Sequence, residues 1–320
     1  MSSSAEEKLA RSASAAPKLA GEGLPMIDFH THTQPSVAAA EEFFGWIGLP
    51  QTHRGDIDDL FANMDANGIE KTLIVPWLPA QDLVAALIAK GETREAAVAQ
   101  IIARWSALNA WAASMARTYP DRIYAIVGVE PILMSPEAIE AEIALRLSEG
   151  ACGIKIAPMF LDAPVTDPRV RLVWDIARRH DVFILSECGA HGTMGHEAWG
   201  HPRHLDRVVA EYPDVRLLLA HLGQGAEDVV AELTHKYPNV YTDLSLRLVG
   251  IGTPGHWTQE EAVRVIRDIG TDRVIYGTNY PIVDVAAFAE TFRALPLTKD
   301  EHEAIGSRNV QNLLGERFRS

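Results

Sequence analysis

Eight alternations of a strand-like segment with a helix-like segment constrain the fold of this chain more than any other feature. The strand-like segments are short apolar runs without clean alternation, which is typical of strands buried on both faces of a parallel sheet. Helix start signals lie between them, such as Thr93 before a long helical pattern and Ser135-Pro136 before another that stops at Gly150. The predicted strands span residues 26–30, 71–77, 123–130, 151–158, 182–189, 215–223, 240–245 and 273–281.

This repeat pattern predicts a single-domain α/β fold, a closed (β/α)8 TIM barrel over residues 26–320. An open doubly wound sheet is the alternative. Such a sheet usually carries a glycine-rich phosphate loop after its first strand, whereas this chain has a histidine pair there. Because catalytic groups of TIM barrels lie at the carboxyl ends of the strands, each predicted strand end is a candidate site position.

The connection between the second and third strands is longer than a barrel needs. It contains two helical patterns, over 81–90 and 94–119, so we expect an extended helical insertion after strand 2. The second pattern has an apolar stripe that either packs on the barrel, the default interpretation, or forms the surface of a homodimer. The stripe consists of Ile101, Ile102, Trp105, Leu108, Trp111 and Met115.

Charge and cysteine content limit the expected partners and compartment. The formal net charge of -14 repels phosphate backbones and anionic lipids, so we expect neither a nucleic acid nor a membrane partner. Only two cysteines occur, Cys152 and Cys188, which fits a reducing cytoplasm better than a disulfide-stapled secreted fold. Residues 1–25 lack the continuous apolar core of a signal peptide, and we interpret them as an N-terminal arm.

The first predicted strand ends in His30-Thr31-His32. Side chains two residues apart on a strand point to the same face, so both imidazoles can bind one metal ion. A histidine-rich turn without a metal is the alternative. We therefore predict that the site binds a divalent metal ion, with zinc as the first candidate and manganese as the alternative.

Three further strand ends bring polar side chains to the same mouth of the barrel. Lys155 lies inside an apolar run of strand four, where its ammonium needs a carboxylate, a metal-bound carbamate or a substrate anion as partner unless it extends to solvent. Glu187 ends strand five and is either a metal ligand or the structural partner of the lysine. His221 ends strand six, where a core histidine bonded to the backbone is the alternative.

Other residues would shape a substrate pocket. Arg54 and Arg247 follow the first and seventh strands, and either guanidinium could bind a substrate carboxylate. Trp77 ends the second strand and could supply a flat apolar wall, although core packing explains it equally well. His191 and His196 lie in a glycine-rich loop, for which an exposed loop is the simpler interpretation.

These motifs, in this order, resemble the metal-dependent amidohydrolase superfamily, and within it the branch that includes aminocarboxymuconate semialdehyde decarboxylase. The resemblance covers the chain from Met26 onward. It rests on four segments: Asp28-Phe29-His30-Thr31-His32, Gly153-Ile154-Lys155, His201 to Leu205 leading to Ala220-His221-Leu222-Gly223, and Tyr276-Gly277-Thr278-Asn279-Tyr280-Pro281. In that family the first-strand histidines, a fifth-strand histidine and an eighth-strand aspartate hold a divalent metal. The sixth-strand histidine, here His221, polarises the substrate or handles a proton.

The chain departs from the family pattern at two positions. Glu187 stands where the branch usually has histidine, and glutamate is a competent zinc or manganese ligand. Asn279 stands where the branch usually has aspartate. An asparagine amide is a weak neutral ligand and cannot accept a proton at neutral pH, so it cannot act as the general base for a metal-bound water.

The sequence therefore supports three hypotheses for a small, carboxylate-bearing substrate. The first is a metal-dependent hydrolase of an amide, ester or lactone, in which His30, His32 and Glu187 hold the ion and His221 steadies the developing oxyanion. The second is a metal-dependent non-oxidative decarboxylase, in which His221 delivers a proton to carbon. The third is a ligand-binding barrel that has lost its base. The missing base at Asn279 weakens hydrolysis most directly.

Overall fold

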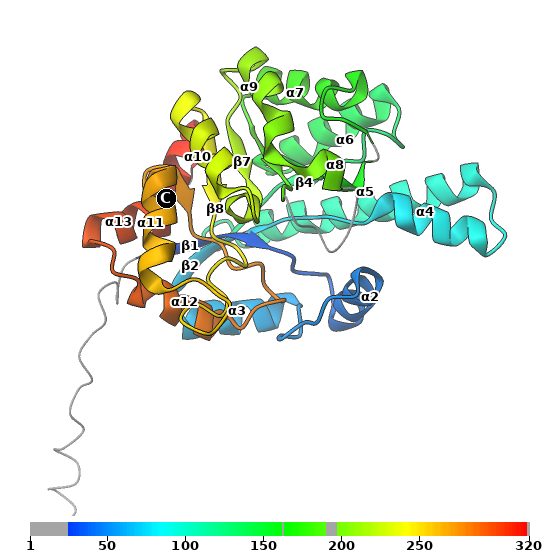
Figure 1. The fold of residues 1–320 in the computed structure, drawn as a ribbon. Helices are drawn as coiled ribbons and strands as arrows, with labels where there is room; N and C mark the ends of the chain where they lie inside the picture. The colour runs from blue at the N-terminus through cyan, green and yellow to red at the C-terminus, as the bar shows by residue number, and fades with distance from the viewer. Residues whose placement is uncertain (1–24, 162, 190–196, 319–320) are drawn as a thin grey trace, which may run out of the picture.

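The computed structural model describes residues 25–161, 163–189 and 197–318. Except for Pro25, the predicted N-terminal arm lies outside these residues, and so do the loop histidines His191 and His196. Parallel strands in the described residues follow one another around a barrel, as the sequence predicts (Figure 1). The strands are β1 (Met26–Thr31), β2 (Ile69–Ile74), β3 (Ile123–Ala125), β4 (Val127–Gly128), β5 (Gly153–Ile156), β6 (Phe183–Ser186), β7 (Leu217–Leu219), β8 (Val240–Asp243) and β9 (Val274–Ile275).

Two features turn these strands into an eight-position barrel. Ile126 separates β3 from β4, so that together they fill the third position, between β2 and β5. The first and last strands then close the ring, because Phe29 donates its N–H to the Tyr276 carbonyl (2.9 Å) and Asn279 donates to the His30 carbonyl (2.9 Å). Closure therefore brings the end of the first strand and the turn after the last strand to one site, as the predicted closed barrel requires.

Helices surround the barrel, and two of them begin at the N-cap residues predicted from the sequence. The Thr93 and Ser135 hydroxyls each accept a hydrogen bond from a backbone N–H three residues on, at Ala96 and Ala138. The helices are α2 (Val37–Ile47), α3 (Ile57–Ala66), α4 (Ala80–Ala89), α5 (Arg94–Thr118), α6 (Pro136–Ser148), α7 (Pro168–His180), α8 (Glu197–Gly200), α9 (Asp206–Glu211), α10 (Glu227–Lys236), α11 (Gln259–Ile269), α12 (Val285–Ala294), α13 (Lys299–Glu303) and α14 (Asn309–Leu314).

The insertion after the second strand consists of α4 and α5, a helical hairpin whose tip projects from the barrel (Figure 1). The later part of α5 packs on β3 and β4. Ile101, Trp105 and Leu108 of the α5 stripe are buried in one core cluster, and the other stripe residues are partly buried against the core. The stripe therefore packs within the chain. A homodimer stays a prediction, which a measurement of molecular mass in solution would test.

Apolar side chains fill both layers of the fold. Phe29, Leu73 and Leu185 belong to a cluster with residues from nearly every strand, which fills the barrel interior, and α14 covers one end of it with Leu313 and Leu314. A second and larger cluster joins the outer faces of the strands to the helices. A third cluster, beside the carboxyl ends of β1 and β2, includes residues of α2. The sequence analysis did not predict α2, although Ser36 marks its start by accepting a hydrogen bond from Ala39 N–H.

Except for β1, the strands end earlier than predicted at their carboxyl ends. The prediction over 215–223 contains only Leu217–Leu219 as strand, after which His221 and Leu222 take left-handed backbone angles (φ 60° and 50°). The prediction over 273–281 contains only Val274–Ile275. A strand lasts only while its neighbours continue the ladder, and at this edge the chain turns inward to present polar side chains. The apolar runs thus predicted the strands but not their ends.

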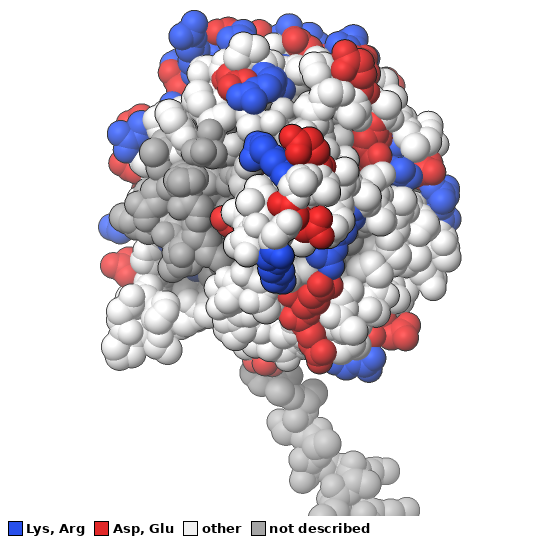
Figure 2. All heavy atoms as spheres, turned by 90° about the vertical axis from the view of Figure 1, so that its right-hand side faces the viewer, with Lys and Arg blue, Asp and Glu red and all other residues white. Residues whose placement is uncertain are grey.

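Among the helices of the described residues, none is both long and apolar enough to cross a membrane. Figure 2 views the molecule from the side on which the α4–α5 hairpin projects. Acidic and basic side chains are interspersed there, so this face does not form a patch of a single sign. Such interspersion is typical of solvated helix surfaces.

Candidate active site

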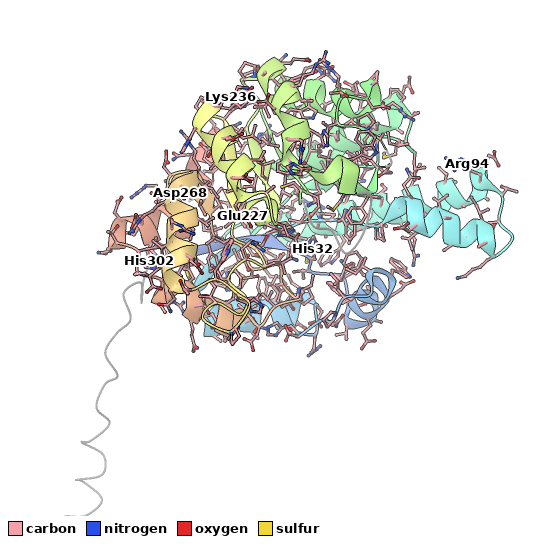
Figure 3. The ribbon with its side chains drawn as sticks, in the orientation of Figure 1. His32, Arg94, Glu227, Lys236, Asp268 and His302 are labelled. Carbon is pink, nitrogen blue, oxygen red and sulfur yellow. The ribbon has the colours of Figure 1, made fainter. Side chains whose placement is uncertain are left out.

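The two histidines of the first strand lie side by side at the carboxyl end of the barrel, with ring centroids 5.1 Å apart. His32 donates from Nδ1 to the Val75 carbonyl (3.1 Å), which leaves the Nε2 lone pair free to bind. Burial lowers the pKa of both imidazoles, that of His32 well below its ordinary value, and both rings are neutral. Figure 3 places His32 in the centre of the molecule, between the barrel and α2.

Asp243, the last residue of β8, orients His30. Its Oδ2 lies 2.9 Å from His30 Nδ1, and its Oδ1 accepts hydrogen bonds from the backbone N–H groups of His221 and Ser245 (3.0 Å each) and from the Ser245 hydroxyl. Burial alone would raise the pKa of Asp243, but His30 and the hydrogen bonds outweigh it and lower the pKa to about 2. His30 therefore donates from Nδ1 and keeps a lone pair on Nε2. Within the described residues this buried Nε2 has no hydrogen-bond partner.

His30, His221 and Asp243 offer ligand atoms within 4.8 Å of one another. Asp243 already accepts four hydrogen bonds, from His30, from the backbone of His221, and from the backbone and hydroxyl of Ser245. We therefore interpret it as the residue that orients a metal-binding histidine, and not as a metal ligand.

Lys155 and Glu187 form a buried ion pair between neighbouring strands. Lys155 Nζ lies 2.6 Å from Glu187 Oε2, and the lysine side chain is 1% exposed. The other carboxylate oxygen, Oε1, lies 2.7 Å from His221 Nε2. Burial would raise the pKa of Glu187, but Lys155 and His221 outweigh it and hold the pKa well below its ordinary value. Glu187 is thus an ionised carboxylate shared by two positive neighbours.

The hydrogen bonds of His221 require a proton on both ring nitrogens. Nε2 faces the Glu187 carboxylate, which can only accept. Nδ1 lies 2.7 Å from the Ser245 hydroxyl oxygen, whose own hydrogen is donated to Asp243, and 3.2 Å from the Ser245 carbonyl. Burial would lower the pKa of His221, but Glu187 and then Asp243 outweigh it and raise the pKa above its ordinary value. The geometry therefore holds His221 as an imidazolium.

Asn279 reaches the same place from the turn after β9. Its backbone lies in the left-handed region (φ 76°), which asparagine tolerates better than most residues. Its side-chain Oδ1 is buried and has no hydrogen-bond partner within the described residues. The preceding residue anchors the turn, because Thr278 donates to Asp28 from its backbone N–H (2.9 Å) and its hydroxyl (2.6 Å).

A cavity of about 180 Å³ opens at this end of the barrel. Its polar side chains are those of His32, Glu187, His221, Gln224 and Asn279, and the rest of its wall is apolar. The wall comes from α2, from the segments after β2 and β5, and from the loops after β8 and β9; it consists of Phe43, Ile47, Leu49, Trp77, Met159, Phe160, Leu246 and Ile282.

The structure brings some of the predicted substrate-binding residues to this cavity and not others. Trp77 lines it. Arg54 does not, because its 61% exposed side chain pairs with Asp56. Arg247 pairs with Glu227 and lies over the Trp257 ring, 4.5 Å from its centroid, instead of facing the cavity. Lys155 lies behind Glu187 and contacts that carboxylate directly.

The sequence model of the amidohydrolase family matches residues 27–315, which includes every strand of the barrel. The chain belongs to the amidohydrolase family. The predicted resemblance to that superfamily is thereby confirmed.

Several known proteins are similar to this amidohydrolase. A γ-resorcylate decarboxylase from Rhodococcus jostii is 23% identical over 189 residues, which are 49% of this chain and 56% of that protein. Curated relatives are thus matched over about a third to a half of their own length (35% to 56%).

Solved structures match nearly the whole fold. An uncharacterised TIM-barrel protein from Bordetella bronchiseptica has a TM-score of 0.70 at 20% identity, over 92% of this chain and 100% of that one. A dihydroxybenzoic acid decarboxylase from Polaromonas, solved with manganese and 2-nitroresorcinol, has a TM-score of 0.69 at 16% identity, over 92% and 98% of the two chains. These likenesses establish the TIM-barrel fold of the amidohydrolase.

Sequence reasoning missed two polar residues of this amidohydrolase's site, Asp243 and Ser245. A signal was present, because Asp243 ends an apolar strand at the edge where the other candidates gather. Gln224 was missed as well, and no signal marked it, because it reaches the cavity through an irregular turn after His221 (φ 36°).

Proposed function

We propose that this amidohydrolase is a metal-dependent, non-oxidative decarboxylase of small aromatic carboxylic acids. The observation that carries the proposal is the hydrogen-bond arrangement of His221, which leaves it a proton donor at the wall of a cavity rich in aromatic side chains. Replacement of a carboxylate on a ring by hydrogen requires an acid of this kind.

The residues present fit a divalent ion. His30 Nε2 and Asn279 Oδ1 are buried polar atoms without partners in the described residues, and His32 Nε2 has a lone pair at the cavity. Neutral imidazole nitrogens and an amide oxygen are suitable ligands for Mn²⁺ or Zn²⁺. We assign these three residues as the ligands. A bound ion would supply positive charge for the substrate's carboxylate and an adjacent oxygen.

Glu187, which the sequence analysis named as a ligand, is better explained by its alternative role. Its two carboxylate oxygens are 2.6 Å from Lys155 and 2.7 Å from His221. Both oxygens are already engaged by donors, which favours the partner role over metal binding. We therefore assign Glu187 as the anion that holds His221 charged and neutralises Lys155.

In the proposed reaction, His221 gives up its Nε2 hydrogen bond with Glu187, and the ring carbon that bears the carboxylate takes the Nε2 proton. The bond between that carbon and the carboxylate then breaks, CO₂ leaves, and the bonding pair returns to the ring. His221 is left neutral and regains its proton before the next turnover.

Hydrolysis, the first function predicted from the sequence, has less support from the site. It needs a base for the attacking water. Among the described cavity residues Glu187 is the one carboxylate, and both of its oxygens already accept from charged donors. Asp243 is enclosed by four hydrogen bonds, and Asn279 cannot take a proton at neutral pH. The similarity to γ-resorcylate decarboxylase points the same way.

The test is to load the purified protein with Mn²⁺ or Zn²⁺ and to measure CO₂ release from 2,6-dihydroxybenzoate and related hydroxybenzoates. An ester and lactone panel is assayed in parallel. CO₂ release that His221→Asn abolishes supports the proposal. Turnover of the esters or lactones alone would favour the hydrolase, and binding of a hydroxybenzoate without any turnover would favour the ligand-binding barrel.

Replacement of both His30 and His32 by alanine should abolish metal retention while the barrel stays folded. These imidazoles lie at the strand ends rather than within the packed interior cluster. The measurement is metal content after dialysis, together with circular dichroism. His235→Ala removes an exposed histidine of α10 and is the matched control. Full metal content in the double variant would refute the ligand assignment.

A further inference from the structure

Outside its polar residues, the wall of the site cavity is aromatic and aliphatic. The rings of Phe43, Trp77 and Phe160 form a connected group, with centroids 5.7 Å apart for Phe43 and Trp77 and 4.7 Å apart for Trp77 and Phe160. Leu246 and Ile282 add to the apolar wall. A substrate ring in this cavity would therefore meet charge or metal-binding atoms at one end and apolar surface over much of the rest.

Among the described residues, no lysine or arginine side chain lines this cavity. The three candidates for that role are engaged elsewhere: Lys155 with Glu187, Arg54 with Asp56, and Arg247 with Glu227. Segment 190–196 contains neither lysine nor arginine in its sequence. Two charged side chains line the cavity, those of His221 and Glu187, and they are paired with each other (2.7 Å), so neither offers an unpaired cation to a second anion.

The size of the cavity adds a second limit. A cavity of about 150 Å³ is enough to bind benzene, and this one has about 180 Å³. It can therefore hold one ring with a few small substituents. A further substituent that stays inside the cavity lies against the apolar wall or beside Gln224, which offers a neutral amide.

We propose that the site selects aromatic acids with a single anionic group, directed at His30, His32 and Asn279, and rejects rings that carry a second carboxylate. This inference rests on the proposed function and names its substrate class more narrowly. A second carboxylate held inside the cavity would lose its water against apolar side chains and meet no lysine or arginine among the described residues. An unpaired charge in such surroundings is strongly disfavoured. Neutral substituents, such as hydroxyl groups, are free of this penalty.

The test compares the binding of three unreactive nitro compounds to the Mn²⁺-loaded protein by calorimetry. The first is 2-nitroresorcinol, whose nitro group imitates the reacting carboxylate. The others are 3,5-dihydroxy-4-nitrobenzoic acid, which adds a carboxylate across the ring, and its amide, which has nearly the same shape without the charge. We expect the amide to bind at least about tenfold more tightly than the acid.

A cation introduced into the wall should relax this selectivity. Gln224→Lys is expected to reduce the ratio of amide to acid affinity by at least about fivefold, because an ammonium would then face the second carboxylate. Gln224→Met has similar length and no charge, and should leave the ratio unchanged. The ratio is a binding measurement, so it does not depend on turnover.

Equal binding of the acid and the amide to the wild-type protein would overturn the inference and leave the proposed decarboxylase intact. Failure of all three compounds to bind would overturn the proposed substrate class and the inference with it. A ratio that changes equally in Gln224→Lys and Gln224→Met would also count against the inference, because it would show that shape decides the selectivity instead of charge.

Discussion

At the scale of single residues, Asn279 has the most direct consequence. It stands where the resembling family has aspartate, and its buried Oδ1 has no partner in the described residues. An amide oxygen is a much weaker ligand for a divalent ion than a carboxylate of the same shape. The site therefore combines two neutral imidazoles with a neutral amide, and we expect it to hold its ion more loosely than an aspartate version would.

Asn279→Asp should tighten metal binding by at least about tenfold, since a carboxylate replaces the amide at nearly constant volume. The measurement is the chelator concentration that removes half of the bound Mn²⁺. At matched metal occupancy, the Asp variant should also hydrolyse, at a higher rate, any ester or lactone that the wild type turns over. The restored base is worth about 10² to 10⁴ in rate. Unchanged metal retention would show that residue 279 is not a ligand.

At the scale of elements, β5 and β6 are joined by more than their backbone ladder. Lys155 of β5 is paired with Glu187, which directly follows β6, and the lysine is almost completely buried. Breaking a buried ion pair by removing one partner usually costs more than replacing both, because it leaves an uncompensated charge. The stability of the barrel therefore depends on both charges of this pair, which lie at the edge of the proposed active site.

Glu187→Gln should lower the free energy of unfolding by about 3 kcal/mol, because the Lys155 ammonium loses its counterion. Metal retention should be nearly unchanged. Urea unfolding and metal analysis on the same preparations measure both quantities. The double variant Lys155→Met, Glu187→Gln serves as the control and should recover part of the lost stability. Loss of the metal without loss of stability would instead restore Glu187 as a ligand.

At the scale of the whole molecule, stability should depend on pH through a carboxyl group outside the site. Glu130 lies just after β4, is 3% exposed, and accepts a hydrogen bond from Gln81 of α4 (3.2 Å). Burial raises its pKa from an ordinary 4.5 to about 8, against the opposing effect of the Gln81 hydrogen bond. Between these pH values the folded protein keeps a proton that the unfolded chain has lost, so stability falls as the pH rises.

The wild type should therefore lose at most about 5 kcal/mol of unfolding free energy from this group between pH 4.5 and about 8. Glu130→Gln should remove this contribution to the slope of unfolding free energy against pH, and the variant should be more stable than the wild type near pH 8. Urea unfolding at a series of pH values measures both curves. Glu232→Gln, at an exposed position of α10, is the control and should leave the slope unchanged. Parallel curves for the wild type and Glu130→Gln would contradict the prediction.

The amino-acid sequence determined the barrel, the helical insertion and which strands carry His30, His32, Glu187, His221 and Asn279, although not where those strands end. These features are readable because apolar runs, cap residues and the order of strands are local properties of the chain.

Only the tertiary structure decided the partners of these side chains. His30 and Asp243 are 213 residues apart in the sequence and meet because barrel closure places β9, the neighbour of β8, beside β1. The same packing drew Glu187 to Lys155 and His221 and turned Arg247 toward Glu227, whereas Arg54 pairs locally with Asp56, two residues along the chain. A side chain's partner depends on register and on the distance between elements, and no local pattern specifies either of these.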